Sequence, residues 1–336
     1  LKTIEEARRL LQSEEFMHIA AVLGGGEDLA EAYRNRLLCA IDSFVQLYGS
    51  GREIAIFSAP GRTELGGNHT DHQHGHVLAA SINLDVIAVV ARREDTTIRV
   101  HSEGFPEDEI SLEELEPVTD KKPTAAELIR GIAARFKQYG CPLETGFDAY
   151  TTSQVMAGSG LSSSAAFEVL LGNICNALYA ENRFTPVELA QMGQYAENVY
   201  FQKPCGLMDQ MASSVGGVVA IDFANPMLPA VHPVAFDFSR TGYVLCIVDT
   251  GGNHADLTAE YAAIPAEMQE VAKYFGKDVL AEVPSAQVLR SIPELRKAFG
   301  DRAVLRAMHF YREDGRVQGE SDALDRGDFE AFLHLV

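Results

Sequence analysis

Apolar residues recur at helical spacing in two stretches near the amino end of the chain, residues 3 to 12 and residues 27 to 49. The run Gly24-Gly25-Gly26 separates them, and consecutive glycines favour a turn over a continuous helix. The pattern therefore predicts two helices joined by a turn. Neither helix carries residues that suggest chemistry.

A polar segment that ends at Gly75 lies between two stretches with the pattern of β-strands. Residues Glu53 to Ala59 predict one strand, and Pro60-Gly61 predicts its end. The apolar stretch from Val77 to Ala91 is interrupted by two polar residues and predicts two further strands. The polar segment is thus expected to be a long loop on a rigid sheet, and such loops are commonly functional.

The remainder of the chain mixes helix and strand patterns, which predicts an α+β fold. In chain order the predicted elements are helix 123–139, strand 146–156, helix 161–180, helix 185–200 capped by Thr185 with Pro186 in its first turn, a helix opened by Gly206, strand 217–223, strand 243–249 and helices beyond Ala255.

The length of 336 residues is more than one hydrophobic core usually serves, so two domains are expected. The predicted division is a helical extension over residues 1–50, a first domain over 51–225 and an incomplete second domain over 226–336. The last predicted helix, 329–336, has no cap, which suggests that the chain is a fragment.

The chain has 48 acidic and 28 basic residues, a formal net charge of −20. This charge repels nucleic acid and anionic lipid, so neither is expected as a partner. No apolar run is long enough to span a membrane. The five cysteines contain no Cys-x-x-Cys pair, and the amino end lacks the apolar segment of a signal peptide. A soluble cytoplasmic protein with reduced cysteines is therefore expected.

Residues Gly158 to Ala166, Gly-Ser-Gly-Leu-Ser-Ser-Ser-Ala-Ala, place two glycines and three hydroxyls ahead of an apolar run. A glycine turn that opens a helix directs several amide N–H groups and the positive helix end at one spot, which suits a phosphate. A helix cap whose serines bond only their own backbone is the alternative. The stretch is not a P-loop because it has no lysine, and Ser163 occupies the third glycine position of a dinucleotide fingerprint.

Four histidines, His69, His72, His74 and His76, lie close together in or beside the polar segment. Imidazole is the commonest ligand of transition metals. Their spacing matches no standard zinc site, however, and no cysteine accompanies them. We therefore expect this cluster to remain free of metal.

The stretch from Gly158 resembles the second motif of the GHMP small-molecule kinases, Pro-x-x-x-Gly-Leu-(Gly/Ser)-Ser-Ser-Ala, without the family proline. In that family the motif wraps the phosphates of ATP. The resemblance implies that the ATP phosphates are bound by Gly158, Ser159, Gly160, Leu161, Ser162, Ser163 and Ser164.

The polar segment resembles the galactokinase signature Gly-Arg-Val-Asn-Leu-Ile-Gly-Glu-His-Thr-Asp-Tyr, including Pro60 ahead of it. By this resemblance Arg62 is the catalytic-site arginine, and Asn68, His69 and Asp71 contact the sugar. Without the resemblance, Arg62 would be interpreted as part of a surface ion pair and Asp71 as an ordinary turn carboxylate.

A third segment, Cys205-Gly206-Leu207-Met208-Asp209-Gln210, resembles the galactokinase sequence Cys-Gly-Ile-Met-Asp-Gln. The resemblance implies that Asp209 is catalytic and faces the anomeric hydroxyl of the sugar, with Gly206 at the sugar. It also implies that Glu197 and Ser164 hold Mg²⁺, with Ser163 as the other candidate hydroxyl. A carboxylate that only stabilises the positive end of its helix is the alternative for Asp209.

The stretch from Asp249 to Tyr261 resembles the galactokinase segment Asn-Ser-x-Val-x-His followed by Ser-x-Tyr, and it implies a contact between Tyr261 and the sugar. The resemblance covers about residues 50 to 336 and implies the two-domain GHMP kinase fold. This fold has a ribosomal S5 domain 2-like first domain and, here, part of a ferredoxin-like second domain. The third glycine-rich motif of the family would lie beyond Val336.

The activity implied is transfer of the γ-phosphate of ATP, with Mg²⁺, to the anomeric hydroxyl of galactose. Two alternatives remain open. Asn68 replaces a family glutamate near the sugar 6-hydroxyl, and Glu64 replaces an asparagine, so the acceptor could instead be galacturonate. The loop gains no arginine that would pair with a sugar carboxylate, however, and this favours galactose. A non-catalytic sugar sensor is the other alternative, but the complete Ser164-Ala165-Ala166 run and the presence of Asp209 favour an enzyme.

Overall fold

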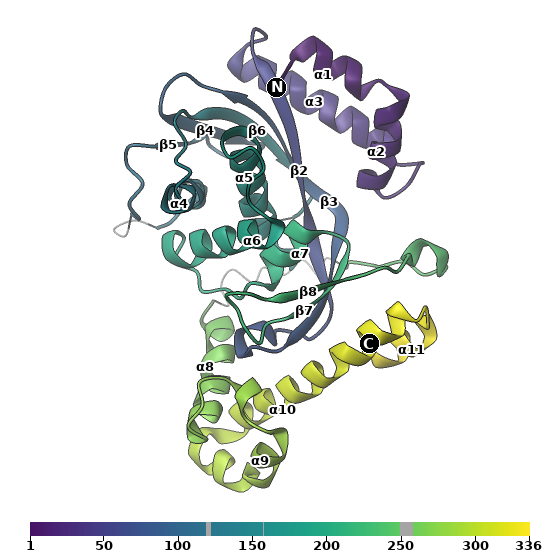
Figure 1. Cartoon of the computed structure of the whole chain (residues 1–336), viewed down its shortest axis with the longest axis vertical. Helices are drawn as coiled ribbons and strands as arrows, with labels where there is room; N and C mark the ends of the chain where they lie inside the picture. The colour runs from purple at the N-terminus through teal and green to yellow at the C-terminus, as the bar shows by residue number, and fades with distance from the viewer. Residues whose placement is uncertain (119–121, 157, 249–257) are drawn as a thin grey trace. The chain divides into compact units, whose positions relative to one another are not determined.

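The computed structural model describes residues 1–118, 122–156, 158–248 and 258–336 (Figure 1). The chain forms two compact units. Unit 1 comprises Leu1–Gly61, Ile82–Ala157 and Leu161–Lys203, and unit 2 comprises Arg62–Ser81, Gly158–Gly160 and Pro204–Val336. The polar segment and Asp209 therefore belong to the same unit, although the sequence separates them widely. The domain limits expected near residues 50 and 226 stay a prediction.

Unit 1 is built on a β-sheet with the strand order β1-β2-β3-β6-β4-β5. The strands are β1 Lys2–Thr3, β2 Glu53–Gly66, β3 His76–Arg92, β4 Thr97–Ser102, β5 Asp108–Ser111 and β6 Phe147–Ser153. β3 runs antiparallel to β6, and β4 runs parallel to β6 and antiparallel to β5. The first residues of β3 and the last residues of β2 belong to unit 2.

Helices cover both faces of this sheet in unit 1 (Figure 1). Val86, Ala88 and Val90 of β3 face one cluster, while Ile87, Val89 and Ala91 face the other, because successive side chains of a strand point to opposite faces. One face is covered by α1 Ile4–Leu11, α2 Glu14–Gly24 and α3 Ala30–Tyr48. The other is covered by α4 Ala125–Gln138, α5 Ser163–Tyr179 and α6 Pro186–Tyr195, which a π-helical turn, η2 Ala196–Tyr200, extends. Burial on both faces explains the almost continuous apolar run of β3.

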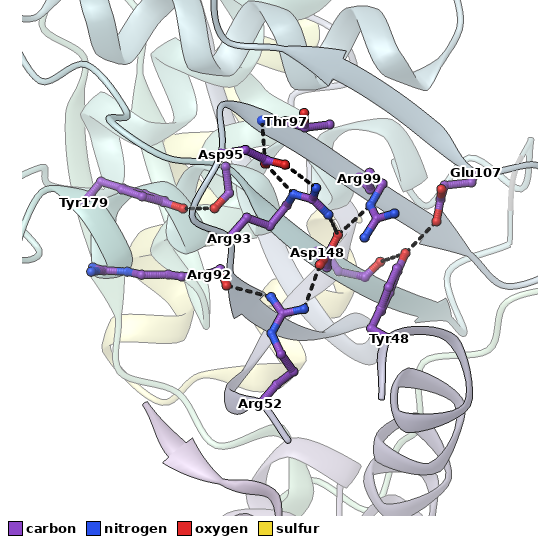
Figure 2. A network of polar contacts seen from close by, with 12 residues as sticks. Tyr48, Arg52, Arg92, Arg93, Asp95, Thr97, Arg99, Glu107, Asp148 and Tyr179 are labelled. Atoms are coloured by element: carbon purple, nitrogen blue, oxygen red, sulfur yellow. Dashed lines mark hydrogen bonds and ion pairs between the residues drawn. The ribbon is translucent and has the colours of Figure 1, made fainter. Parts of the chain in front are cut away.

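A buried carboxylate joins several strands at one end of this sheet (Figure 2). Asp148 of β6 has no exposed surface and accepts contacts from Arg52 at 3.0 Å, Arg93 at 2.8 Å and Arg99 at 2.7 Å. Burial alone would raise the pKa of Asp148, but the hydrogen bonds from Arg99, Arg93 and Arg52 outweigh it and lower the pKa. The ionised carboxylate thus holds the start of β2, the end of β3 and β4 together.

Helix α3 is attached to β3 through a second buried carboxylate, Asp85. Arg36 of α3 forms an ion pair with Asp85 and donates to the backbone carbonyls of Asp85 and Thr152 at 3.0 Å each. The Tyr33 hydroxyl donates to Asp85 at 2.7 Å. The amino-terminal helices are therefore bonded to the sheet by specific polar contacts as well as by apolar packing.

Unit 2 contains a short antiparallel hairpin and the helices that follow residue 204. β7 Val218–Asp222 pairs with the beginning of β3 and with β8 Ala230–Val234. The other elements are α7 Met208–Val215, α8 Thr258–Tyr274, α9 Ser285–Arg290, α10 Ile292–Asp325 and α11 Phe329–Leu335, with the 3₁₀ turns η1 Asp71–Gln73, η3 Phe238–Arg240 and η5 Leu280–Glu282. Gly300 has a φ of 84° and interrupts α10. No helix in the described ranges is long and apolar enough to cross a membrane.

Three predictions about strands are wrong. Val77 to Ala91 is one strand, because its two polar residues are paired: Asn83 donates to the carbonyl of Gly24, and Asp85 is bound by α3. β2 does not end at Ala59 but continues through Pro60-Gly61 to Gly66, since the fixed φ of proline is compatible with an extended chain. Residues 243–248 of the predicted strand 243–249 are not in a strand, and residue 249 lies outside the described residues.

Candidate active site

The end of β2 and the loop after it, residues 64–76, form the predicted sugar site and are called the sugar loop here. Glu64 accepts a hydrogen bond from the backbone N–H of His69 at 3.0 Å and another from Nδ2 of Asn68 at 3.0 Å. His69 has a φ of 52°, in the left-handed region, which turns the chain back toward Glu64. Burial raises the pKa of Glu64, against the opposing effect of His69. The amide nitrogen of Asn68 is thus directed at Glu64. The second N–H of this amide can donate a hydrogen bond to a ligand, and its carbonyl oxygen can accept one.

Asp71 connects the sugar loop to helix α7. The carboxylate is 8% exposed, accepts from the backbone N–H of His72 at 2.9 Å and accepts from the backbone N–H of Met208 at 3.3 Å. A Cβ atom at Gly206 would lie 1.8 Å from the Asp71 carboxylate. Only glycine therefore fits at position 206, and the structure places Asp71 directly beside Gly206.

Arg62 and Asp209 form an ion pair between β2 and the first turn of α7. Nε and Nη2 of Arg62 both lie 2.8 Å from Oδ1 of Asp209. Nη1 of Arg62 donates to the backbone carbonyl of Gly160 at 2.9 Å. The Arg62 side chain is only 10% exposed and the Asp209 side chain is 34% exposed. Arg62 is therefore not in a surface ion pair, and it orients a carboxylate that solvent can reach.

The turn before α5 has the left-handed backbone that its glycines suggested. Gly158 and Gly160 have φ values of 75° and 78°, and Ser162, directly before α5, has a φ of 60°. A Cβ atom at Gly160 would meet nothing within 4 Å, so glycine is needed there for its backbone conformation and not for space. Such a turn at a helix start is suited to binding an anion through backbone N–H groups.

Within unit 1, Ser164 and Glu197 lie in contact. The Ser164 hydroxyl donates to Oε1 of Glu197 at 3.0 Å, and the Lys203 ammonium lies 2.7 Å from the same oxygen. Glu197 is 2% exposed and belongs to the π-helical turn η2, and such turns are frequent at functional sites. Hydroxyl and carboxylate oxygens are the ligands that Mg²⁺ prefers. The pair fits the predicted magnesium site, with Ser164 rather than Ser163 as the hydroxyl in contact with Glu197.

Comparisons with known proteins show which family the chain resembles. Residues 42–92 match the galactokinase galactose-binding signature, and residues 127–217 match the N-terminal domain of GHMP kinases. A galactokinase of Streptomyces coelicolor is 35% identical over 294 residues, which are 86% of this chain and 74% of that protein. The chain belongs to the galactokinase family. A galactokinase of Actinobacillus pleuropneumoniae serotype 3 is 33% identical over 305 residues, covering 88% of this chain and 76% of that one.

Solved structures confirm the predicted α+β fold of the GHMP kinases. The galactokinase of Lactococcus lactis complexed with galactose has a TM-score of 0.72 and 27% identity, covering 89% of this chain and 77% of that chain. A phosphomevalonate kinase of Streptococcus pneumoniae has a TM-score of 0.54 at 12% identity, covering 84% of this chain and 77% of that chain. The second likeness concerns the fold alone.

Two predictions from the resemblance to galactokinases concern residues 249–261, which the structure describes only in part. Residues 249–257 of the stretch that resembles Asn-Ser-x-Val-x-His lie outside the described residues. Tyr261 lies near the start of α8 and is 48% exposed. Its contact with the sugar stays a prediction.

Two residues in contact with predicted site residues were missed from the sequence. Lys203 follows Glu197 by six residues, and the π-helical turn that brings its ammonium to Glu197 has no reliable sequence signal. His309 of α10 places Nε2 3.1 Å from the backbone carbonyl of Asn68. Among the described residues, no group of three or more His, Cys, Asp or Glu is arranged to hold a metal ion.

Proposed function

We propose that this member of the galactokinase family transfers the γ-phosphate of ATP to the anomeric hydroxyl of galactose. The observation that carries the proposal is the ion pair in which Arg62 orients the Asp209 carboxylate, in a chain whose residues 42–92 match a galactose-binding signature. The Lactococcus lactis relative is a galactokinase complexed with galactose. The galacturonate kinase and the non-catalytic sensor are not favoured by these relatives.

Asp209 accepts the proton of the attacking hydroxyl. A base must lie within hydrogen-bond reach of the proton that it removes, and a partly exposed carboxylate at the start of α7 can be reached by a sugar. Arg62 fixes the orientation of this carboxylate, because its Nε and Nη2 both contact Oδ1 of Asp209. Phosphoryl transfer needs little covalent chemistry from the protein, so positioning and neutralisation of charge supply most of the catalysis.

The resemblance and the local geometry support Gly158, Ser159, Gly160, Leu161, Ser162, Ser163 and Ser164 as the residues that bind the ATP phosphates, and Glu197 with Ser164 as the residues that hold Mg²⁺. Mg²⁺, when bound, neutralises charge on the phosphates. Asn68, His69, Asp71, Gly206 and Tyr261 are proposed to bind the sugar. A cytoplasmic location stays a prediction from the cysteine usage.

A coupled assay of ADP release tests the function directly. We expect ADP release with galactose and Mg-ATP, and a lower kcat/KM with galacturonate. Chelation of Mg²⁺ should abolish ADP release. A higher kcat/KM for galacturonate would make the protein a uronic acid kinase. Galactose binding without ADP release for any sugar would identify a sensor.

A further inference from the structure

Helix α10 lies along the sugar loop and contacts it at several points within unit 2. His309 contacts the carbonyl of Asn68 at 3.1 Å, and the Asp314 carboxylate accepts from the backbone N–H of His76 at 2.7 Å. Asp314 also lies 2.8 Å from Nδ1 of His76. A Cβ atom at Gly75 would lie 2.8 Å from both Phe310 and Asp314. One face of α10 thus determines where the loop lies.

The next turns of α10 bring a carboxyl group against the start of this loop. Glu320 is 1% exposed, and no hydrogen-bond partner for either of its carboxyl oxygens is found among the described residues. A Cβ atom at Gly66 would lie only 1.7 Å from Oε2 of Glu320, so the carboxyl group occupies the space that glycine leaves. Beside it, a Cβ atom at Gly67 would lie 2.8 Å from Val317.

We propose that Glu320 is a positioning residue for the sugar loop. It keeps the loop in the arrangement that binds galactose only while the Glu320 carboxyl group is neutral. The inference rests on the proposed function. Glu64, Asn68, His69 and Asp71 follow or flank the Gly66-Gly67 contact in this loop, so a movement of α10 away from Gly66 displaces the groups that bind the sugar.

The neutral form follows from the surroundings. An ionised carboxylate that is removed from water without a partner costs far more free energy than the protonated acid. Of the charged groups near it on α10, Glu313 disfavours ionisation and Arg316 favours it, but Arg316 is already paired with Glu313 at 2.9 Å. The adjoining loop contributes two glycines, which carry no charge. Burial, with a smaller effect of Glu313, raises the pKa of Glu320 to about 7.

The direction of the pH dependence follows from this shift. The pKa of Glu320 is raised in the arrangement in which its carboxyl group lies against Gly66. Glu320 therefore stabilises this arrangement of the loop fully below the ordinary pKa of a glutamate, and the stabilisation is lost as the pH rises toward about 7. Three other groups of the loop have shifted pKa values, and burial lowers the pKa of one of them, His72. The pKa of His76 is raised mainly by its hydrogen bond to Asp314, and the pKa of Glu64 is raised by burial. A substitution of Glu320 alone separates its effect from theirs.

The test uses the whole chain and the variants Glu320→Gln and Glu320→Met, with Glu330→Gln on the exposed face of α11 as the control. Amide hydrogen exchange is measured without ligand at pH 5.5 and 7.5. At pH 7.5 the sugar loop of the wild type should exchange faster than that of Glu320→Gln. At pH 5.5 the loops of the two proteins should exchange alike. Helix α5 should exchange alike in both proteins.

Galactose affinity, measured by calorimetry over the same range, should weaken by up to about tenfold in the wild type and in Glu330→Gln. It should change much less in Glu320→Gln and Glu320→Met, while the affinity for ATP should follow the same pH course in all four proteins. Equal pH dependence of the wild type and a folded Glu320→Gln, in exchange and in affinity, would overturn the inference. Loss of ADP release with galactose at every pH would instead contradict the proposed function and leave the exchange result to decide the role of Glu320.

Discussion

At the scale of single residues, the ion pair of Arg62 with Asp209 makes the sharpest prediction. Replacing Asp209 with Asn keeps the shape of the side chain but removes the proton acceptor, so kcat should fall by about 100-fold or more. Galactose and ATP should still bind, because the backbone of α7 and the sugar loop are unchanged. Steady-state kinetics and calorimetry measure the two effects. Asp301→Asn, which removes an exposed carboxylate of α10, is the control and should leave kcat unchanged.

Glu64 makes a second residue-scale prediction, about the choice of sugar. Its carboxylate accepts a hydrogen bond from the amide nitrogen of Asn68, so a sugar carboxylate that approaches this amide would also meet the negative charge of Glu64. Glu64→Gln removes the repelling charge and should raise kcat/KM for galacturonate relative to galactose by about tenfold. Glu53→Gln, at the exposed start of the same strand, should leave the ratio unchanged. An unaltered ratio in Glu64→Gln would mean that Glu64 does not select the substrate.

The site residues that could be predicted are those that belong to a short sequence motif. Short motifs contain Arg62, Asp71, Gly206 and Asp209. In the structure Arg62 contacts Asp209, and Asp71 lies beside Gly206 and accepts from the backbone of α7. The parts that could not be predicted depend on contacts between distant segments. The carboxyl group of Glu320 meets Gly66 across more than 250 residues of sequence, and no periodicity or motif connects the two.

At the scale of secondary-structure elements, Asp148 determines how firmly the strands of unit 1 are joined. Asp148→Asn leaves three arginines beside a buried amide, and loss of one partner of a buried ion pair typically costs about 3–5 kcal/mol of unfolding free energy. Urea denaturation at pH 7 measures this loss. Asp95→Asn removes an exposed partner of Arg93 and should have a much smaller effect.

The same carboxylate gives a pH dependence with a defined sign. The pKa of Asp148 in the folded protein lies below its ordinary value of 3.8. Its contribution to stability is therefore present above about pH 4 and is lost as the pH falls through the lowered value. The difference in unfolding free energy between wild type and Asp148→Asn should shrink in that acid range, and a constant difference would contradict this assignment.

The elements that could be predicted were those whose own residues determine them. Thr185 and Glu188 form the capping box at the start of α6, with Pro186 in the first turn, as the local sequence indicated. The predicted break in β3 was wrong because the partners of Asn83 and Asp85 come from α2 and α3, which no local pattern reveals. Strands β4, β5 and β8 are short, and a few apolar residues do not distinguish such strands from loops.

At the scale of the whole molecule, the net charge of −20 opposes the approach of ATP. Screening shortens the range of this repulsion, so kcat/KM for Mg-ATP should rise about two- to fivefold when the ionic strength increases from 10 to 150 mM. Neutral galactose should show no such dependence, and it serves as the control in the same assay. A decrease for Mg-ATP would show that local cations, such as Lys203, govern the encounter instead of the overall charge.

The amino-terminal helices have a practical consequence for anyone who shortens this protein. The match to the galactokinase signature begins at residue 42, so a trimmed gene product that starts there would keep every proposed site residue. It would lack α1, α2 and most of α3, which cover Ile87, Val89 and Ala91, all without exposed surface in the intact chain. A broad apolar sheet face in water favours self-association. We expect the trimmed protein to aggregate on expression. Almost no soluble protein should be obtained, although all of the proposed catalytic residues are present.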